Sequence, residues 1–529
     1  MIEGQYFMRL AIIPARGGSK RISKKNIRKF AGKPLISWSI IKALEANIFD
    51  RLIVSTDDEE IAEISKSYGA EVPFIRPIEL SDDHTKIRPV LRHALMWLSD
   101  HDFTADLVCC ILPTAPFLDK NDLNLGLEKL IVNDDRIIVP ITKYSSPIQR
   151  ALTLDLDGTI KPVWQEKIKE RSQDLEQTYF DSGQFYWASK KTFLEKSDDL
   201  LGEKSLGIVI PNERVEDIDT ENDFMVAESK FLALQKEKNI SKICIGTANF
   251  AQNYGISNEA GKLKNQEIGD IFNMMKAIGI KTVDTAPSYA DAEKIIGNIG
   301  VDHFSIMSKL PSIPKDIKDI NSWVQNQIET ILDDLSVESI YSIFFHDPSQ
   351  LIDNDFGKDA YKHLIALKEK GLIQKIGASI YDPSILNQLT KGFDLDIIQA
   401  PLNIFDRRIS DSGWLKKLKK QNIEVVTRSI FLQGLLLMEP KERPIAFNKW
   451  KNNFDLYDEW LIENSISRLE ACLRHQFSYS EIDKIIIGID SSYQLFEISN
   501  FFKHGHLDCP NELSSDDKHL IDPNYWKIK

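Results

Sequence analysis

Cysteine is scarce in this sequence. The 529 residues contain five cysteines, an odd number, and their spacing is not that of a metal site: Cys109, Cys110, Cys244, Cys472 and Cys509. This pattern argues against a disulfide framework and against a cysteine-based zinc site. We therefore expect reduced thiols.

Long apolar runs and basic stripes are also missing. No stretch approaches the roughly 18 uninterrupted apolar residues of a membrane span, and Met1 is not followed by a basic-then-apolar leader. We expect a cytoplasmic protein with no membrane contact. The formal net charge is −13, and no basic stripe exists outside one early loop, which argues against general nucleic-acid binding.

The chain is too long for one ordinary core, so two or three domains are expected. Its first half alternates strand and helix. Residues 51–74, for example, read as a strand, an acidic helix start and a second strand that ends the segment at residues 70–74. This alternation predicts an open, mostly parallel, Rossmann-like α/β sheet. Residues 227–241 then carry Lys and Glu in a helical pattern, and a new apolar strand begins at Ile243. We predict one domain over residues 1–238 and a second over residues 239–529.

The positive charge that the rest of the chain lacks gathers at residues 16–33. Leu10 to Pro14 predicts a buried strand, and the Gly17-Gly18 turn after it lets the backbone approach a ligand closely. The segment holds eight basic residues and no acidic one: Arg16, Lys20, Arg21, Lys24, Lys25, Arg28, Lys29 and Lys33. Its spacing matches neither Gly-Lys-Ser/Thr nor G-x-G-x-x-G. The residues alone are consistent with a nucleoside triphosphate site or with a plain surface loop.

The run IIPARGGSK, followed by KKN and FAGKPLI, resembles the opening of the CMP-sugar synthetases. These cytidylyltransferases activate sialic-acid-like sugars. The resemblance implies CTP and a nonulosonic acid as substrates and Mg²⁺ as cofactor, and homodimers are common in the family. It assigns catalytic roles to Arg16 and Lys20, which bind the triphosphate, and nucleotide binding to Gly17, Gly18, Ser19, Lys25 and Asn26.

Three later segments extend this comparison. Thr56 to Glu59 predicts a helix N-cap, and Arg76 is a candidate nucleotide contact. Pro113 and Thr114 follow a predicted strand, at the edge where ligands of open α/β sheets collect. They resemble a turn that lies under the base. Leu112 stands where many sialic-acid enzymes have Gln, so a base contact from that position stays open.

Residues 143–187 bear on the choice of sugar. The runs SSPIQRAL and RSQDLEQTYFDSGQFYW resemble the pseudaminic acid branch of the family. The N-acetylneuraminate branch typically has Arg-Pro-Asn-Gly where this chain has residues 180–183. From the residues alone, the polar side chains of this region read first as ordinary loop and strand residues. The resemblance assigns substrate binding to Gln149, Arg150, Arg171, Gln173, Asp181 and Gln184.

Two carboxylates are candidates for a metal site. Val215 to Asp219 alternates as a strand does, which predicts Asp217 and Asp219 on one face. Mg²⁺ prefers oxygen ligands, usually one or two carboxylates together with substrate phosphates. The family uses a matching Asp-x-Asp for the metal. A helix start at Thr220 and Asp223 is a second reading, and it is compatible with the first.

From Ile243 onward, strand and helix alternate for about 260 residues, which predicts a single (β/α)8 TIM barrel. Asp284, Tyr289, Lys309 and His346 follow successive predicted strands, where barrel enzymes hold catalytic groups. A tyrosine serves as a general acid near neutral pH only if a cation lowers its pKa of roughly 10. We predict that Lys309, paired with Asp284, lowers it, and that His346 holds the substrate carbonyl oxygen.

This ordered set resembles the catalytic tetrad of the aldo/keto reductases. The resemblance covers residues 242 to about 500 and implies NADPH or NADH as cofactor, with an unknown carbonyl substrate. Three positions depart from the family. Ile380 replaces a common Asn, Arg428 stands where an aromatic residue often stacks on the nicotinamide, and Gln494 stands where an Arg often meets the 2′-phosphate. The predicted cofactor residues are Gly246, Thr247, Ser379, Gln399, Arg428, Gly488, Ser491, Gln494 and Glu497.

Together these features predict a bifunctional enzyme. One half would be a CTP-dependent cytidylyltransferase that activates a nonulosonic acid, for which pseudaminic acid is the favoured candidate. The other half would be an NAD(P)H-dependent aldo/keto reductase. The alternative is a CMP-N-acetylneuraminate synthetase whose barrel serves for docking or scaffolding without catalysis. A second alternative is a non-enzymatic function, namely a sugar-nucleotide binding or scaffolding protein whose catalytic sites have decayed.

Overall fold

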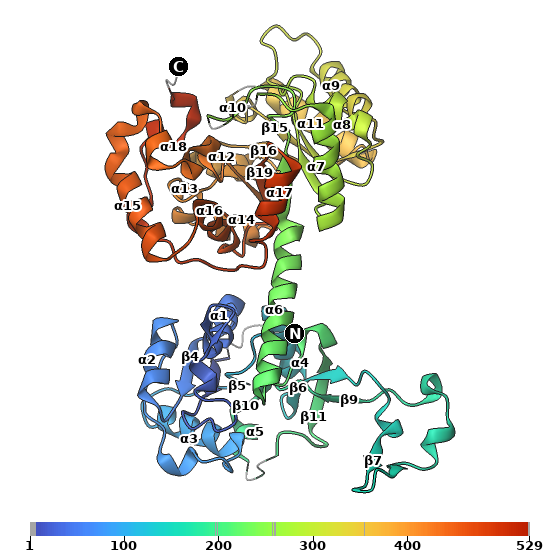
Figure 1. Cartoon of the computed structure of the whole chain (residues 1–529), viewed down its shortest axis with the longest axis vertical. Coiled ribbons are helices and arrows are strands. Elements are labelled where there is room, and N and C mark those ends of the chain that lie inside the picture. The colour runs from blue at the N-terminus through green and yellow to red at the C-terminus, as the bar shows by residue number, and fades with distance from the viewer. Residues whose placement is uncertain are drawn as a thin grey trace. The chain divides into compact units, whose positions relative to one another are not determined.

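A computed structural model describes residues 7–195, 197, 199–256, 258, 261–353 and 355–526. The chain divides into two compact units, Met1–Leu232 and Ala233–Lys529, whose elements are labelled in Figure 1. The division falls within one helix, α6 (Glu221–Lys242). The boundary expected between residues 238 and 239 lies in the same helix and stays a prediction.

The first unit is built on a seven-stranded sheet with the order β11-β6-β10-β5-β1-β4, and β9 pairs with β6. Five strands share one direction, because β1 is parallel to β4 and β5, β11 is parallel to β6, and β10 lies antiparallel between β5 and β6. This arrangement confirms the predicted open, mostly parallel sheet. The strands are β1 (Arg9–Pro14), β4 (Arg51–Ser55), β5 (Leu107–Ile111), β6 (Ile137–Lys143), β9 (Tyr179–Asp181), β10 (Phe185–Ser189) and β11 (Ser205–Val209).

Helices cover both faces of this sheet. Ala11 and Ile13 of β1 belong to one buried cluster, and Leu10 and Ile12 belong to another on the opposite face. Because both faces are covered, the strand is apolar without interruption rather than alternating. The first cluster includes side chains of α1 (Leu35–Ala46), α2 (Glu59–Ser67) and α4 (Lys120–Val132), and the second those of α3 (Ile87–Ser99) and α5 (Lys190–Leu194).

Two predicted strands of this unit are wrong. After α2 the chain makes only isolated bridges, Ile53 to Glu71 and Thr56 to Ile75, so no second strand forms there. Residues 215–219 are extended at Val215 (φ −129°, ψ 127°) but pair with no strand. The shorter elements are η1 (Lys25–Ile27), β2 (Lys29–Phe30), β3 (Lys33–Pro34), η2 (Ile78–Leu80), η3 (Ile148–Arg150), β7 (Leu152–Leu154), β8 (Ile160–Pro162), η4 (Lys167–Lys169), η5 (Ser172–Asp174) and η6 (Asn212–Arg214).

The second unit is a closed barrel of eight strands, β12 to β19 in sequence order, and every neighbouring pair is parallel. The predicted (β/α)8 barrel is therefore confirmed. Its strands are β12 (Ile243–Gly246), β13 (Thr282–Asp284), β14 (Ser305–Leu310), β15 (Ile340–Phe345), β16 (Ile373–Ser379), β17 (Ile397–Pro401), β18 (Glu424–Arg428) and β19 (Lys484–Gly488).

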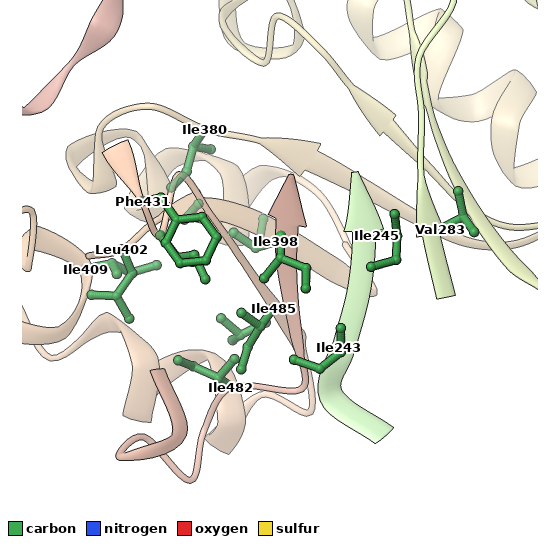
Figure 2. Packing of buried hydrophobic residues seen from close by; sticks show 14 of the residues in the cluster. Ile243, Ile245, Val283, Ile380, Ile398, Leu402, Ile409, Phe431, Ile482 and Ile485 are labelled. Atoms are coloured by element: carbon green, nitrogen blue, oxygen red, sulfur yellow. The ribbon is translucent and has the colours of Figure 1, made fainter. Parts of the chain in front are cut away.

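Successive side chains on a barrel strand serve different layers. Cys244 lies in the barrel interior with Met307 and Phe344, whereas Ile243 and Ile245 belong to the larger cluster shown in part in Figure 2. The helical elements of this unit are α7 (Asn265–Ile278), α8 (Ala292–Ile299), α9 (Ile320–Leu335), α10 (Ser349–Asp353), α11 (Asp355–Glu369), η7 (Pro383–Ile385), α12 (Leu386–Gly392), α13 (Arg408–Asp411), α14 (Trp414–Lys420), η8 (Leu432–Leu437), η9 (Pro440–Glu442), η10 (Ile445–Trp450), α15 (Lys451–Glu463), α16 (Arg468–Phe477), α17 (Ser492–Ser499), η11 (Asn511–Leu513), α18 (Lys518–Ile521) and η12 (Pro523–Tyr525).

In the part of the chain that the structure describes, no helix combines the length and the hydrophobicity needed to cross a membrane. The cytoplasmic location and the homodimer stay predictions.

Candidate active sites

The glycine turn after β1 is held by the start of α2. The Gly17 amide donates to Asp57 Oδ1 at 3.1 Å. A Cβ atom at position 17 would lie 2.6 Å from Asp58 Oδ2, so this close approach requires glycine. Asp58 is the N-cap residue and accepts from the Ile61 amide at 2.9 Å. The predicted helix cap is therefore confirmed.

Asp57 also reaches Arg76, a contact that links two distant segments of the chain. Arg76 is buried, with its Nη2 atom 3.3 Å from Asp57 Oδ1 and its Nε atom 3.1 Å from Ser81 Oγ. Burial lowers the pKa of Arg76, and the Asp57 carboxylate opposes that effect. Arg76 is thus held in a fixed place at the edge of the site.

A cavity of about 510 Å³ lies beside this turn. Five basic side chains and two acidic ones line it, so its charge is positive in a chain of negative net charge. Eight of the predicted residues contribute to the lining: Arg16, Ser19, Lys20, Lys25, Asn26, Arg76, Pro113 and Thr114. Residues without an assigned role also contribute, among them Arg21, Asp82, Asp83 and Leu112.

Asn26 and Lys25 shape the loop from within. The Asn26 side chain is buried and donates to the Arg16 carbonyl at 2.9 Å, so it fixes the turn. Lys25 Nζ donates to the Ile218 carbonyl and lies 3.7 Å from Asp219 Oδ1. Burial lowers the pKa of Lys25, and the Asp219 carboxylate opposes it.

Asp83 bridges the two cations that were predicted to bind triphosphate. One of its oxygens is 2.6 Å from Arg16 Nη1 and the other is 2.5 Å from Lys20 Nζ. The hydrogen bond from Lys20 is the main cause that lowers the pKa of Asp83. Sequence reasoning gave this carboxylate no role, because the contact joins positions more than sixty residues apart.

The metal candidates lie next to the same loop. Asp219 forms ion pairs with Arg21 and Lys25. Partial desolvation, and then the charge of the Asp219 carboxylate, raise the pKa of Asp217. Among the described residues, no cluster of three or more His, Cys, Asp or Glu side chains could hold a metal ion.

The helix start predicted at Thr220 and Asp223, directly after these carboxylates, is present. The Thr220 amide donates to Asp223 Oδ2 at 2.7 Å, and the Asp223 amide donates to Thr220 Oγ1 at 3.2 Å. The capping pair uses neither Asp217 nor the Asp219 side chain.

The predicted sugar residues lie outside the cavity lining. Gln149 donates to the Glu176 carbonyl at 2.8 Å and Arg150 to the Glu170 carbonyl at 3.0 Å. Exposed side chains are found at Arg171 and Gln173.

Two further sugar candidates come from the strands β9 and β10 and the turn between them. Asp181 accepts from Tyr186 Oη at 2.6 Å. Gln184 is buried and donates to the Arg214 carbonyl at 2.7 Å, while its Oε1 atom has no partner among the described residues. The roles of all six candidates stay predictions.

The barrel centres its polar groups on one buried ion pair. Lys309 Nζ lies 2.8 Å from both oxygens of Asp284 and 2.9 Å from the Thr285 carbonyl. The two side chains are 3% and 5% exposed. Burial opposes the charge on Lys309, but Asp284 and Tyr289 outweigh it and raise the pKa of Lys309. The ammonium is therefore firmly charged.

Tyr289 lies over this pair, with its ring centroid 5.1 Å from Lys309 Nζ. Desolvation raises the pKa of Tyr289, and the charge of Lys309 reduces that rise without cancelling it. The prediction that Lys309 brings the pKa below its ordinary value is therefore wrong for the structure as it stands, because burial is the larger effect. The hydroxyl keeps its proton at neutral pH.

His346 follows β15 and lines a cavity in the barrel that Asp284, Tyr289 and Lys309 also line. Burial, and then the charges of Lys309 and Arg428, lower the pKa of His346. At neutral pH the imidazole is uncharged, so it can act as a hydrogen-bond partner rather than as a cation.

A buried hydrogen-bond chain extends from the ion pair to two other strands. Gln399 Nε2 donates to Asp284 Oδ1 at 2.8 Å, and Ser379 Oγ donates to Gln399 Oε1 at 2.8 Å. Side chains on β13, β14, β16 and β17 are thereby joined into one network. Sequence reasoning assigned Ser379 and Gln399 to the cofactor and missed this contact with the catalytic candidates.

These groups border a cavity of about 480 Å³. Eleven predicted residues line it: Gly246, Asp284, Tyr289, Lys309, His346, Ser379, Gln399, Arg428, Gly488, Gln494 and Glu497. Thr247 and Ser491 lie outside this lining. Thr247 is buried with no partner for its Oγ1 atom among the described residues, and Ser491 caps α17.

Asn249 was missed from the sequence although it lines the cavity. Its Nδ2 atom donates to the Ile489 carbonyl at 2.6 Å and to Asp490 Oδ1 at 2.8 Å. The Asp490 amide in turn donates to Gln494 Oε1 at 2.7 Å. No local pattern marks Asn249, because its partners are 240 and 241 residues away.

Comparison with known proteins gives a separate match for each unit. Residues 10–240 match the Cytidylyltransferase family, and residues 242–509 match the Aldo/keto reductase family. The pseudaminic acid cytidylyltransferase of Campylobacter jejuni is 43% identical over 219 residues, which cover 41% of this chain and 94% of the relative. The CMP-N,N'-diacetyllegionaminic acid synthase of Legionella pneumophila is 33% identical over 236 residues, which cover 43% of this chain and 97% of the relative.

Among solved structures, the holo form of aldo-keto reductase AKR11C1 from Bacillus halodurans is 17% identical, with a TM-score of 0.42. The match covers 50% of this chain and 88% of that one.

Proposed function

This chain belongs to the cytidylyltransferase family over residues 10–240 and to the aldo/keto reductase family over residues 242–509, and we propose that both of its units are catalytic. The first unit activates a nonulosonic acid with CTP and releases pyrophosphate. Identity of 43% to a pseudaminic acid cytidylyltransferase, against 33% to a legionaminic acid synthase, supports pseudaminic acid as the sugar.

The basic cavity beside the glycine turn is the observation that carries the transferase proposal. In this reaction the anomeric hydroxyl of the sugar attacks the α-phosphate of CTP, and pyrophosphate leaves. Negative charge builds on the phosphate oxygens in the transition state, and preorganised cations stabilise it. We assign this role to Arg16, Lys20 and Lys25, and their position in the lining of one cavity supports it. Asn26 keeps the turn in shape through its bond to the Arg16 carbonyl.

Asp217 and Asp219 are proposed to hold the Mg²⁺ that the family uses. The donor set fits, because adjacent carboxylates complete their coordination with phosphate oxygens and Asp219 lies beside the loop cations. The metal supplies charge stabilisation on the phosphates.

Pyrophosphate release by the full chain with CTP and Mg²⁺ tests the first activity. We expect pseudaminic acid to be used better than N-acetylneuraminate or legionaminic acid. Better use of N-acetylneuraminate rejects the sugar assignment, and no pyrophosphate with any of the three rejects the transferase itself. The Asp217→Asn/Asp219→Asn double variant should lose activity at limiting Mg²⁺. Asp223→Asn is the matched control, because it removes a neighbouring carboxylate that holds the Thr220 and Asp219 amides while both proposed metal ligands keep their side chains.

The second unit is proposed to reduce a carbonyl group. The buried Asp284–Lys309 pair under Tyr289 is the observation that carries this assignment. Burial keeps the pKa of Tyr289 above its ordinary value, so the hydroxyl carries the proton that a general acid must donate. The lowered resting pKa expected from the sequence is not needed for this role, because Tyr289 releases its proton only as charge develops on the carbonyl oxygen. The fixed charge of Lys309 stabilises the resulting phenolate. Neutral His346 hydrogen-bonds the same oxygen and orients the substrate.

A nicotinamide cofactor would supply the hydride for this reaction, and the polar side chains proposed to hold it, among them Ser379, Gln399 and Gln494, line the cavity that contains the tetrad. We propose NADH rather than NADPH. Gln494 and Glu497 belong to α17 and line the cavity, and the described lining has only two cations, Lys309 and Arg428. An additional phosphate next to Glu497, with no cation at Gln494, would be repelled.

Titration of the full chain with each cofactor, followed by nicotinamide fluorescence, tests this assignment without a carbonyl substrate. NADH should bind more tightly than NADPH, and Gln494→Arg should narrow the difference. Tighter binding of NADPH rejects the cofactor preference. Failure of both cofactors to bind rejects the reductase.

A further inference from the structure

Among the residues that the structure describes, one cation in the barrel cavity has no counter-charge. Two basic side chains occur in the described lining, Lys309 and Arg428. Asp284 neutralises Lys309 at 2.8 Å. For Arg428, no carboxylate of the described residues lies within 4.0 Å. Burial raises the pKa of the nearby Asp406, an effect that Arg408 and then Arg428 oppose, and the Asp406 carboxylate already pairs with Arg408 at 2.8 Å.

Arg428 is nonetheless held firmly. It ends β18 at the carboxyl edge of the barrel, and its Cζ atom lies 4.1 Å from the centroid of the Tyr381 ring. Its Nη2 atom donates to the Ile380 carbonyl at 3.0 Å, and Nη1 donates to Ser429 Oγ at 3.2 Å. A guanidinium has five N–H donors. Two are used by these bonds, which leaves donors for a ligand.

The charge acts on the groups proposed to catalyse reduction. It contributes to the lowered pKa of His346, after burial and Lys309, and it offsets part of the rise that burial causes in the pKa of Tyr289. Arg428 therefore faces the same space as the proton donor and the carbonyl-orienting imidazole.

The acidic side chains elsewhere in the lining favour binding of an anion at Arg428. Glu442, Asp490 and Glu497 line the same cavity and would repel an anion from their side. A half-buried cation with no counter-charge among the described residues is costly, and a bound anion reduces that cost. The catalytic end of the cavity is thus built to receive one negative charge.

We propose that the natural substrate of the reductase is an anionic carbonyl compound whose carboxylate or phosphate group pairs with Arg428. This inference rests on the proposed reductase function. The planar guanidinium suits both anions, because it can offer two parallel N–H donors to two oxygens. The substrate carbonyl accepts a hydride from NADH at carbon and a proton from Tyr289 at oxygen. It leaves as an alcohol, and the cofactor leaves oxidised.

The competing role for Arg428 is contact with the nicotinamide, since its position is one where an aromatic residue often stacks on that ring. In that case Arg428 would affect all carbonyl substrates alike. An anion-binding role instead changes the ratio between charged and neutral substrates of the same shape.

The test uses three aldehydes with the full chain: succinic semialdehyde, its neutral methyl ester, and glycolaldehyde phosphate. Binding is measured by calorimetry without cofactor, and reduction is followed with NADH. We expect the wild-type chain to favour at least one anion over the ester by roughly 10- to 100-fold, the usual worth of a charge-assisted hydrogen bond. The preferred anion distinguishes a carboxylate substrate from a phosphate substrate.

Arg428→Gln should bring the anion-to-ester ratio close to one, and Arg428→Lys, which keeps the charge, should retain part of it. Equal binding of the acids and the ester overturns the inference, as does a preference that survives Arg428→Gln or a failure of all three aldehydes to bind. NADH titration of the same samples keeps the two proposals apart. If NADH binds while the ratio is one, only the anion assignment fails, and if NADH does not bind, the reductase fails.

Discussion

Breaking the Asp284–Lys309 pair from one side is expected to destabilise the barrel more than removing both charges. Lys309 Nζ lies 2.8 Å from both Asp284 oxygens, and the side chains are 3% and 5% exposed. Asp284→Asn leaves an ammonium group in a dry site without a counter-charge. Removing one partner of a buried pair costs about 3–5 kcal/mol, a large share of the roughly 5–15 kcal/mol that stabilises a domain.

Lys309→Met is expected to cost a similar amount, because Asp284 would keep only the Gln399 amide and lose its cation. The Asp284→Asn/Lys309→Met double variant leaves no unpaired charge. Replacing a whole buried pair by neutral groups is often close to neutral. We therefore expect the double variant to be more stable than either single variant. Its loss of unfolding free energy should be much smaller than the sum of the two single losses.

Thermal unfolding of the full chain by calorimetry measures this, and the transition of the first unit serves as an internal reference. At about 2–4 °C per kcal/mol, the single variants should lower the Tm of the barrel transition by roughly 6–20 °C. A double variant that loses as much as the two single variants together would refute the reasoning, because the two charges would then be independent.

Three further outcomes follow from individual contacts. Asp83→Asn should lower the KM for CTP, by roughly 2- to 5-fold on the scale of surface ion pairs, because Asp83 occupies Arg16 and Lys20. An unchanged or higher KM for CTP would contradict the idea that Asp83 competes with the triphosphate for these two cations. Burial raises the pKa of Glu293 from 4.5 to about 7, so its contribution to stability is present below pH 4.5 and is lost as pH rises through 7. The difference between wild type and Glu293→Gln in urea unfolding should change by on the order of 3 kcal/mol across that range, and a constant difference contradicts the assignment. Tyr289→Phe should lower reduction by roughly 100-fold or more, the usual worth of a general acid, and near-normal turnover would place the proton donor elsewhere.

Much of the architecture was predictable because its signals are local. The uninterrupted apolar strand from Leu10 to Pro14 predicts a sheet covered on both faces, and the structure confirms it. The eight barrel strands follow from their spacing for the same reason. Where the signal was short, as at residues 70–74 and 215–219, strands were predicted that do not form, because an extended segment becomes a strand only if a neighbour lies in register beside it.

The candidate sites divide along the same line. The sequence by itself pointed to many of the residues that line the two cavities, because they lie on one short motif or at the end of a strand, as Arg16, Lys20 and Lys309 do. It did not separate them from neighbours such as Gly17 and Thr247, which lie outside the linings. Contacts between distant segments were decided only by the tertiary structure. They are the ion pair of Asp57 with Arg76, the ion pair of Asp83 with Arg16, and the hydrogen bond from Gln399 to Asp284. The direction of the Tyr289 pKa belongs to this second group, because it depends on how completely the fold removes water from the hydroxyl. So does the unpaired charge of Arg428, because a counter-charge is missing only once every neighbouring side chain has been placed.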